Sequence, residues 1–360
     1  MSWHDAARVL AVRLDALGDV LMTTPALRAL KAGGPGRTVT LLTSAAGAAA
    51  AALIPEVDET IVYEAPWMKA TPPRTTRAAD LAMIERIRGG RFDAAVVFTV
   101  YSQNPLPAAL LCYLGDVPRR LAHCHENPYQ LLTDWVPDPE PTRLVRHEVR
   151  RQLDLVGTVG ATCADERLSL RVPDAARARV RELLRRRRLD RRPWVLLHPG
   201  ATAPSRRYPP EHFAEAARGL AQATGAAIVL SGSAGEPAVH ETLAAMIGVE
   251  VHALTGLPLE DFAALVAAAP VLVANNSAPV HVAAAVGTPV VDLYALTNPQ
   301  HTPWAVPHRV LSHDVPCRNC YKSVCPEGHH DCLRRVAPKA VVTAALELLS
   351  SSASGPRGAR

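Results

Sequence analysis

The chain alternates short apolar segments with amphipathic segments, and this alternation runs through two successive stretches of the sequence. The apolar segments have the length of β-strands, and the segments between them have helical spacing. Strands separated by helices run parallel, so the pattern predicts βαβ units and an α/β fold. In the first stretch we expect strands at 9–14, 38–43, 59–63, 93–99 and 119–122, helices near 24–32, 77–88, 106–114 and 144–159, and a short strand at 167–172.

An arginine-rich segment separates the two stretches. Asp174 follows a proline and suits a helix N-cap, and the arginines at 185–188 suit a helix C-terminus. These arginines could contact a phosphate-rich partner, but a solvated helix end is the simpler interpretation. From Trp194 the alternation restarts. The predicted organisation is a Rossmann-like domain at 1–173, a linker at 174–193, a second Rossmann-like domain at 194–337, a helix at 338–350 and a disordered tail at 351–360.

Composition narrows the class of protein. The residues are 48% hydrophobic but only 4% aromatic, so the cores must be built mainly from Ala, Leu and Val. No apolar run approaches the roughly 20 residues that a membrane helix needs, and we find no signal-peptide cleavage site near the N-terminus. We therefore expect a cytoplasmic protein. The net charge of +5 is modest for this length and does not indicate nucleic-acid binding.

Three loops of the second stretch follow predicted strands and carry polar residues. The carboxyl ends of parallel strands face the ligand crevice of an open sheet, so these loops should converge. Two similar α/β domains also imply a cleft between them, which is the default place for a ligand. The candidates are His198, Gly200, Thr202, Arg206 and Arg207 in the first loop, Ser231, Gly232 and Glu236 in the second, and Asn275, Asn276, Ser277 and His281 in the third.

The third loop is the best phosphate-binding candidate. The helix that opens at Ser277, Ala278 and Pro279 would present backbone N–H groups with partial positive charge. Arg206 could add a formal charge, and Glu236 could accept hydrogen bonds from ribose hydroxyls. Each has a structural alternative, since the third loop could simply cap a helix, Arg206 could be an exposed cation and Glu236 a charge in a first helical turn. His281 could equally be a packed histidine. Neither a GxGxxG fingerprint after the first strand nor a GxxxxGK[ST] loop is present, which argues against dinucleotide oxidoreductases and P-loop NTPases.

Four of the seven cysteines cluster near the C-terminus, at Cys317, Cys320, Cys325 and Cys332 in a loop spanning 316–333. Four thiolates can close a tetrahedral zinc site or hold an iron–sulfur cluster. The alternative is a loop pinned by local disulfides or by reduced thiols. The sequence thus leaves a structural metal site as one of two interpretations.

Asp19 is the most unusual candidate. Gly18, Asp19 and Val20 directly follow the turn after the first predicted strand, where a phosphate site would need glycines and cations. From the residues alone, Asp19 could cap the helix near 24–32 or interact with its dipole.

Five segments together resemble glycosyltransferase family 9, the ADP-heptose:lipopolysaccharide heptosyltransferases and their relatives. They are RLDALGDVLMTTPALRALK, HPGATAPSRRYPPEHF, LSGSAGEP, LTGLPLEDFAALVAAAPVLVANNSAPVHVAAAVGTPVVDLY and CRNCYKSVCPEGHHDCL, and the resemblance covers nearly all of residues 8–345. It implies a GT-B fold, in which two Rossmann-like domains face each other across a cleft. The acceptor binds mainly the N-terminal domain and the nucleotide sugar mainly the C-terminal domain.

The resemblance also implies the reaction and its residues. The reaction is an inverting, metal-independent transfer of heptose from ADP-L-glycero-D-manno-heptose, as in lipopolysaccharide biosynthesis, with no cofactor required. Asp19 is the implied catalytic base. The predicted donor-binding residues are Gly18, Thr202, Arg206, Ser231, Glu236, Asn276, Ser277, Ala278, Pro279 and His281. We expect an ADP-sugar and a glycan, glycolipid or small-molecule acceptor as partners, no nucleic acid, and allow for peripheral contact with the inner membrane face.

Two departures from the family pattern widen the choice of donor. Asn276 replaces an aspartate that helps to hold the sugar, and Ala278 replaces a glycine. Arg206 replaces a lysine, which keeps the charge but changes its shape. One alternative is therefore a GT-B transferase that uses another nucleotide sugar on a cell-wall or natural-product acceptor. A second is a non-catalytic sugar-nucleotide-binding protein, although the presence of Asp19, Arg206 and Glu236 together argues against it.

Overall fold

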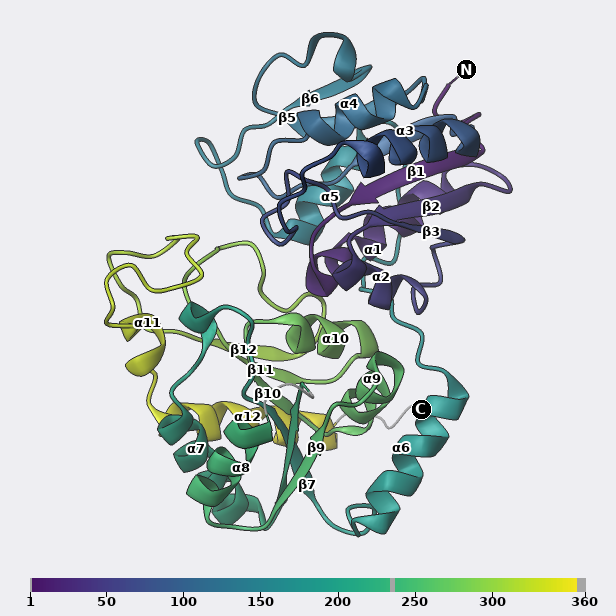
Figure 1. The fold of residues 1–360 in the computed structure, drawn as a ribbon. Coiled ribbons are helices and arrows are strands. Elements are labelled where there is room, and N and C mark those ends of the chain that lie inside the picture. The colour runs from purple at the N-terminus through teal and green to yellow at the C-terminus, as the bar shows by residue number, and fades with distance from the viewer. Residues whose placement is uncertain (1, 234–236, 355–360) are drawn as a thin grey trace. The chain divides into compact units, whose positions relative to one another are not determined.

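The computed structural model describes residues 2–233 and 237–354 (Figure 1). The chain divides into two compact units, Met1–Leu170 and Arg171–Arg360. Each unit contains its own six-stranded sheet, and every paired strand runs parallel to its neighbour. None of the helices in the described ranges is long and apolar enough to cross a lipid bilayer.

The sheet of the first unit has the strand order β3-β2-β1-β4-β5-β6. Its strands are β1 Arg8–Arg13, β2 Thr38–Thr43, β3 Glu59–Val62, β4 Ala94–Val97, β5 Arg120–Cys124 and β6 Asp134–Pro137. Its helices are α1 Leu17–Ala32, α2 Ala45–Ala51, α3 Ala78–Gly90, α4 Leu106–Leu114 and α5 Glu148–Gly157, with the 3-10 turn η1 Tyr129–Leu131. The central strands β1 and β4 are buried almost throughout, as expected for parallel strands with helices on both faces.

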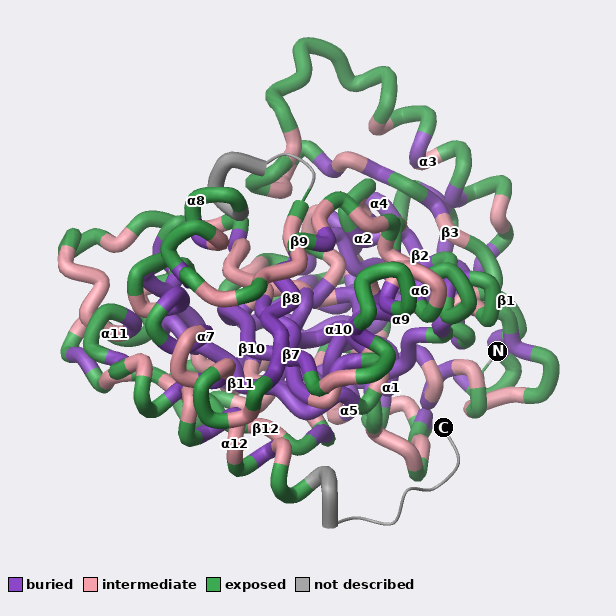
Figure 2. The backbone as a smooth tube through the Cα atoms, turned by 90° about the horizontal axis from the view of Figure 1, so that it is seen from below, coloured by how far each residue is buried: buried purple, intermediate pink, exposed green. Residues whose placement is uncertain are grey.

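The sheet of the second unit has the order β12-β11-β10-β7-β8-β9. Its strands are β7 Trp194–His198, β8 Ala227–Gly232, β9 Val251–Thr255, β10 Leu272–Asn275, β11 Val290–Leu293 and β12 His308–Leu311. Its helices are α6 Asp174–Arg186, α7 Pro210–Thr224, α8 Pro237–Ile247, α9 Leu259–Ala268, α10 Ala278–Val286, α11 Asp331–Arg334 and α12 Pro338–Ser354, with the 3-10 turn η2 Pro204–Arg206. Figure 2 shows β7, β8 and β10 as the buried centre of this unit.

Several boundaries differ from the sequence prediction. The segment 167–172 is not a strand, although Leu168, Leu170 and Val172 are buried as its apolar alternation suggested. It packs beside α1, where the backbone N–H of Ser169 donates to the hydroxyl of Thr24 at 2.9 Å instead of pairing with a sheet. The strands β6, β9 and β12 were not predicted. The last helix continues to Ser354 rather than ending at 350, because its Ser and Ala residues are compatible with a helix. The rest of the predicted tail, 355–360, lies outside the described residues.

The helix α1 begins earlier than the predicted 24–32, and its sequence explains why it can run through Pro25. Proline has no N–H to donate to the carbonyl four residues earlier, which here belongs to Leu21. The hydroxyl of Thr24 donates to that carbonyl at 2.7 Å, so the buried oxygen keeps a partner. The helix therefore extends back to Leu17 and takes in the Gly18-Asp19-Val20 tripeptide as its first turn.

Candidate active site

Asp19 lies in the first turn of α1, where the strand order of the first sheet reverses between β1 and β4. Open α/β sheets bind ligands at such a reversal, at the carboxyl ends of the strands. The N-cap of α1 is Ala16, which makes no side-chain cap, so the interpretation of Asp19 as the cap of a helix near 24–32 is wrong. Its position in the first turn does favour an anion through the helix dipole. Gly18 is buried in the same turn.

A completely buried arginine organises the carboxylates around Asp19. Arg13, the last residue of β1, contacts Asp15 through Nε at 2.9 Å, Asp19 through Nη2 at 3.2 Å and Glu148 through Nη1 at 2.7 Å. Glu148 opens α5 and is fully buried, whereas the Asp15 and Asp19 side chains are 14% and 20% exposed. Each guanidinium nitrogen thus contacts a different carboxylate, and the two partly exposed carboxylates are those beside the first turn of α1.

The charges of this cluster shift the pKa values of its members. Burial disfavours the charged form of Arg13, but Asp15, Glu148 and Asp19 hold its pKa above the ordinary value. Burial raises the pKa of Asp15 to about 6; Arg13 lowers it and Asp19 raises it. The amide of Gln103 donates to Asp15 at 2.5 Å and favours its charged form. A carboxyl group whose pKa burial raises to about 6 therefore lies beside Asp19.

In the second unit, hydrogen bonds bring the predicted loops together. Asn275, at the end of β10, donates to the carbonyl of Pro199 at 2.6 Å and accepts from the backbone N–H of Tyr208 at 3.0 Å. His198 Nδ1 lies 3.1 Å from the hydroxyl of Ser231, which is completely buried at the end of β8. The loops after β7, β8 and β10 therefore converge at the carboxyl edge of the sheet, where the strand order reverses between β7 and β10.

Asn276 is held in one orientation by two acceptors. Its Nδ2 donates to Asp292 Oδ2 at 3.0 Å and to the backbone carbonyl of His301 at 2.9 Å. Burial raises the pKa of Asp292, on β11, to about 8, while Asn276 and Arg206 both favour its charged form. An aspartate at position 276 would face a carboxylate and a carbonyl, so the amide suits this chain.

The helix α10 begins at Ala278, with Ser277 as its N-cap and Pro279 in its first turn. The Ser277 hydroxyl does not cap the helix; its contacts are the carbonyls of Asn275 at 3.2 Å and Gly200 at 3.4 Å. The first turn of α10 thus has no side-chain cap. His281 is buried one turn further, with its ring edge-on to His301 at 6.4 Å between centroids.

The remaining donor candidates are placed differently. Arg206 ends η2 and is half-buried, and it interacts electrostatically with Asp292 and Tyr294. Thr202 is exposed in the loop between β7 and η2. Glu236 lies outside the described residues. Asn276 therefore donates to the buried carboxyl group of Asp292, and Arg206 interacts with the same group electrostatically.

Comparisons with known proteins decide the family. The model of glycosyltransferase family 9 (heptosyltransferase) matches residues 81–330. The chain belongs to glycosyltransferase family 9. This transferase is 28% identical to lipopolysaccharide heptosyltransferase 2 of Salmonella typhimurium, over 95% of this chain and 99% of that protein. It is also 28% identical to lipopolysaccharide heptosyltransferase 2 of Escherichia coli, over 93% and 96% respectively.

Solved structures confirm the fold. A family 9 glycosyltransferase from Veillonella parvula superposes on the transferase with a TM-score of 0.80 and 22% identity, covering 98% of each chain. The Escherichia coli ADP-heptose lipopolysaccharide heptosyltransferase II superposes with a TM-score of 0.74 and 25% identity, covering 96% of this chain and 100% of that one. The prediction of a GT-B fold with two Rossmann-like domains is thus confirmed.

The four clustered thiols of the transferase line one small cavity. The loop that carries them lies between β12 and α12, and its cavity of about 20 Å³ is also lined by His329 and His330. Cys317 Sγ lies 3.8 Å from His329 Nε2. Across the described ranges, however, no three His, Cys, Asp or Glu side chains form a group that could hold a metal ion. The predicted zinc or iron–sulfur site therefore has no support from the geometry: the thiols share a cavity but do not form a set of ligands.

The same cysteine-rich loop supports the loop of Arg206. The hydroxyl of Ser205 donates to the carbonyl of Lys322 at 2.7 Å, and its backbone N–H donates to that of Ser323 at 3.0 Å. Ser205 immediately precedes Arg206 in η2. The position of Arg206 thus depends on the cysteine-rich loop.

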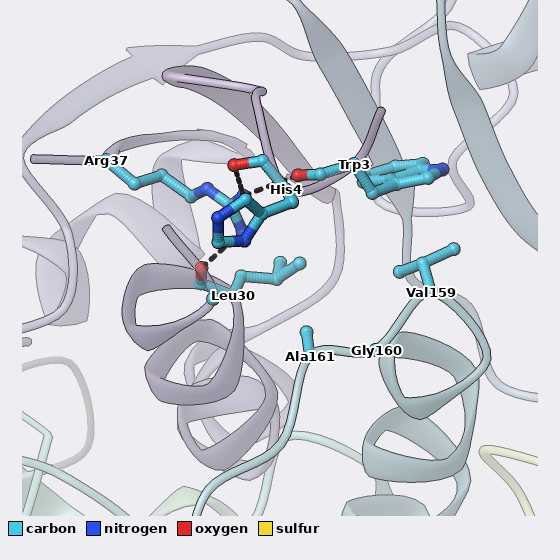
Figure 3. Close-up of a pocket in the computed structure, with 8 residues that line it drawn as sticks. Trp3, His4, Leu30, Arg37, Val159, Gly160 and Ala161 are labelled. Atoms are coloured by element: carbon cyan, nitrogen blue, oxygen red, sulfur yellow. Dashed lines mark hydrogen bonds between the residues drawn. The ribbon is translucent and has the colours of Figure 1, made fainter. Parts of the chain in front are cut away.

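A larger cavity of the first unit lies elsewhere. Its volume is about 210 Å³, and it is lined by residues that include Trp3, Leu30 and Val159. The Arg37 guanidinium beside it donates to the backbone carbonyls of Leu30, Trp3 and His4 (Figure 3). It also donates to the carbonyl of Ala6, so its hydrogen bonds are satisfied. This cavity lies where the strands begin, away from the edge that carries Asp19.

Sequence reasoning missed four charged residues of these sites: Arg13, Asp15, Glu148 and Asp292. Arg13 and Glu148 are 135 positions apart, so no local pattern links them. The one available signal was an arginine at the end of an apolar strand, since buried arginines need carboxylate partners.

Proposed function

We propose that the transferase moves a heptose from ADP-L-glycero-D-manno-heptose to a hydroxyl group of a glycolipid that resembles the lipopolysaccharide core. The observation that carries this proposal is the similarity to lipopolysaccharide heptosyltransferase 2 of Salmonella typhimurium over nearly the full length of both chains, 95% and 99%. We place the ADP-sugar in the second unit and the acceptor in the first. No cofactor takes part.

In an inverting transfer, the acceptor oxygen forms a bond to the anomeric carbon while the bond from that carbon to the β-phosphate oxygen breaks. We infer that the carboxylate of Asp19 accepts the proton of the acceptor hydroxyl. Its contact with Arg13 at 3.2 Å supports this role, because the cation fixes the carboxylate and keeps it charged.

ADP leaves with additional negative charge on its β-phosphate. Arg206 and the first-turn N–H groups of α10 are the groups we assign to that charge. The convergence of the loops after β7 and β10, tied together by Asn275, supports the assignment. We also assign donor contacts to Thr202, Ser231 and His281 from the family resemblance.

Replacing Asp19 tests the base directly. We expect Asp19→Asn to lower kcat by about a hundredfold or more, since an amide cannot accept the proton. ADP affinity, measured by calorimetry, should be unchanged because the nucleotide binds the other unit. A folded Asp19→Asn variant with full turnover would contradict the role of Asp19.

The donor sugar needs its own experiment, because Asn276 and Ala278 stand where the family has Asp and Gly. A transferase for another nucleotide sugar, acting on a cell-wall or natural-product acceptor, is therefore the second candidate. Release of ADP or another nucleotide should be measured with ADP-heptose and with other ADP- and UDP-sugars, each with a truncated lipopolysaccharide core as acceptor. Faster turnover of another sugar would favour the second candidate, and binding without any turnover would favour a non-catalytic protein.

A zinc ion or an iron–sulfur cluster at Cys317, Cys320, Cys325 and Cys332 stays a prediction. It rests on the four clustered cysteines of the sequence, since the described side chains form no set of metal ligands. Elemental analysis of untagged protein tests it, and a lack of stoichiometric zinc or iron would end it. A cytoplasmic location and peripheral contact with the inner membrane face likewise stay predictions from the sequence, to be tested by cell fractionation.

A further inference from the structure

We propose that Asp15 and Asp19 act as a carboxylate pair on Arg13, in which the charge of Asp15 sets how strongly Asp19 binds the acceptor proton. Asp15 is then a positioning residue that acts through Asp19. This inference rests on the proposed function, in which Asp19 is the base.

Three carboxylates share the guanidinium of Arg13. Arg13 is completely buried and contacts Asp15, Asp19 and Glu148 at 2.9, 3.2 and 2.7 Å. Three carboxylates that share one guanidinium compete for its charge. The ionisation state of each carboxylate then depends on the other groups that face it.

Glu148 has further support away from the first turn of α1. Burial raises the pKa of Glu148, whereas Arg13, Arg151 and Gln152, which donates to its Oε1 at 2.7 Å, favour its charged form. Its carboxylate is completely buried, so it cannot meet an acceptor. The two carboxylates of the cluster that are partly exposed are therefore Asp15 and Asp19.

Asp15 is tied to a different loop from Asp19. Gln103 Nε2 donates to Asp15 Oδ1 at 2.5 Å, and Gln103 Oε1 accepts from the backbone N–H of Val100 at 3.2 Å. The loop after β4 thus orients Asp15 beside the loop after β1. Three charged groups face Asp15: Arg13 from β1, Asp19 from α1 and Glu148 from α5.

The pair titrates as one system. When Asp15 is ionised, its charge opposes ionisation of Asp19, which makes Asp19 the stronger base. When Asp15 holds a proton, Arg13 interacts more fully with Asp19, which then binds the acceptor proton less strongly. Activity should therefore fall as the pH falls through about 6, where Asp15 takes up its proton.

Two variants should shift the acidic limb of the pH profile of kcat/KM in opposite directions. Asp15→Asn removes the second charge, so we expect the acidic limb of kcat/KM to move to lower pH and the plateau to drop about tenfold, because Asp19 is then a weaker base. Gln103→Ala removes a hydrogen bond that favours ionised Asp15, so its acidic limb should move to higher pH. A general loss of protein stability would not shift the acidic limbs of the two variants in opposite directions.

The profiles should be measured on the full chain with ADP-heptose, with Asp19→Asn and Asp116→Asn alongside. Asp116 is an exposed carboxylate of the same unit, paired with Arg88, so its variant should keep the wild-type profile. Opposite limb shifts support the pair. If Asp19→Asn is inactive but both other variants keep the wild-type limb, the pair is overturned and the base survives. If Asp19→Asn keeps full turnover, the base itself is wrong and the pair fails with it.

Discussion

The ionisation of Asp292, beside the predicted donor-binding residue Asn276, should make the stability of the fold depend on pH. Its pKa is about 8 in the folded chain, against an ordinary value of 3.8, because it is completely buried. Between these values the folded state holds more protons than the unfolded state. The free energy of unfolding therefore loses a contribution as the pH rises from about 4 to about 8.

We expect Asp292→Asn to remove this contribution, because an amide does not titrate and can still accept from Asn276. Urea denaturation at about pH 5 and about pH 8 should show a smaller fall in the free energy of unfolding for the variant than for the wild type. Asp116→Asn, at an exposed carboxylate, serves as control and should keep the wild-type fall. Equal falls in all three proteins would show that Asp292 does not titrate in this range.

At the scale of the elements, α2 supports the turn that carries Asp15. The hydroxyl of Ser44 caps α2 by accepting from the backbone N–H of Gly47 at 3.1 Å, and it donates to the carbonyl of Asp15 at 2.8 Å. A Cβ on Gly47 would lie 2.1 Å from Thr43 Oγ1, 2.9 Å from Val20 and 3.3 Å from the Asp15 carbonyl. Only glycine allows this close approach of α2 to β2 and α1.

We expect Gly47→Ala to lower the free energy of unfolding by about 1–3 kcal/mol through overpacking. Gly89→Ala is the matched control, because Gly89 also lies in a helix but a Cβ there meets nothing within 4 Å. It should be neutral or slightly stabilising in the same denaturation experiment. A Gly47→Ala variant as stable as the wild type would show that the turn adapts easily.

The cysteine-rich loop gives a second prediction at this scale. Ser205→Ala removes the hydrogen bond from η2 to the carbonyl of Lys322, so Arg206 should be held less firmly. We expect ADP affinity, measured by calorimetry, to fall about fivefold, as for the loss of one hydrogen bond. Ser350→Ala, at a hydroxyl that donates within α12 to Leu346, should leave ADP affinity unchanged. Unchanged affinity in Ser205→Ala would show that the loop does not support Arg206.

The sequence predicts the elements better than their edges. The buried central strands were found because their apolar residues are continuous, as in 9–14. The edge strands β6, β9 and β12 were missed because they are short and partly polar, and β6 ends at Pro137. Of the site, the loops at strand ends were predictable, whereas the cluster on Arg13 depends on contacts between distant positions. The fold brings such residues together without a local pattern.

At the scale of the whole molecule, ligand binding should report the donor. A nucleotide sugar that binds only the folded chain stabilises it by mass action, by about 2.7 kcal/mol at a hundred times its Kd. We expect ADP-heptose to raise the melting temperature more than other nucleotide sugars at equal concentration. The Asp19→Asn variant should respond in the same way, since Asp19 is assigned to the acceptor. A larger rise with another nucleotide sugar would favour the second candidate function.

The repeated strand order has a consequence for how such proteins can diversify. Each unit contains its own complete sheet and buries its own apolar cluster. The boundary between the two units falls between Leu170 and Arg171. Genetic recombination at this point would join two compact units, each with its own sheet and core, from different parents. New acceptor preferences could then arise by exchanging one half of a gene while the residues assigned to the nucleotide are inherited intact in the other.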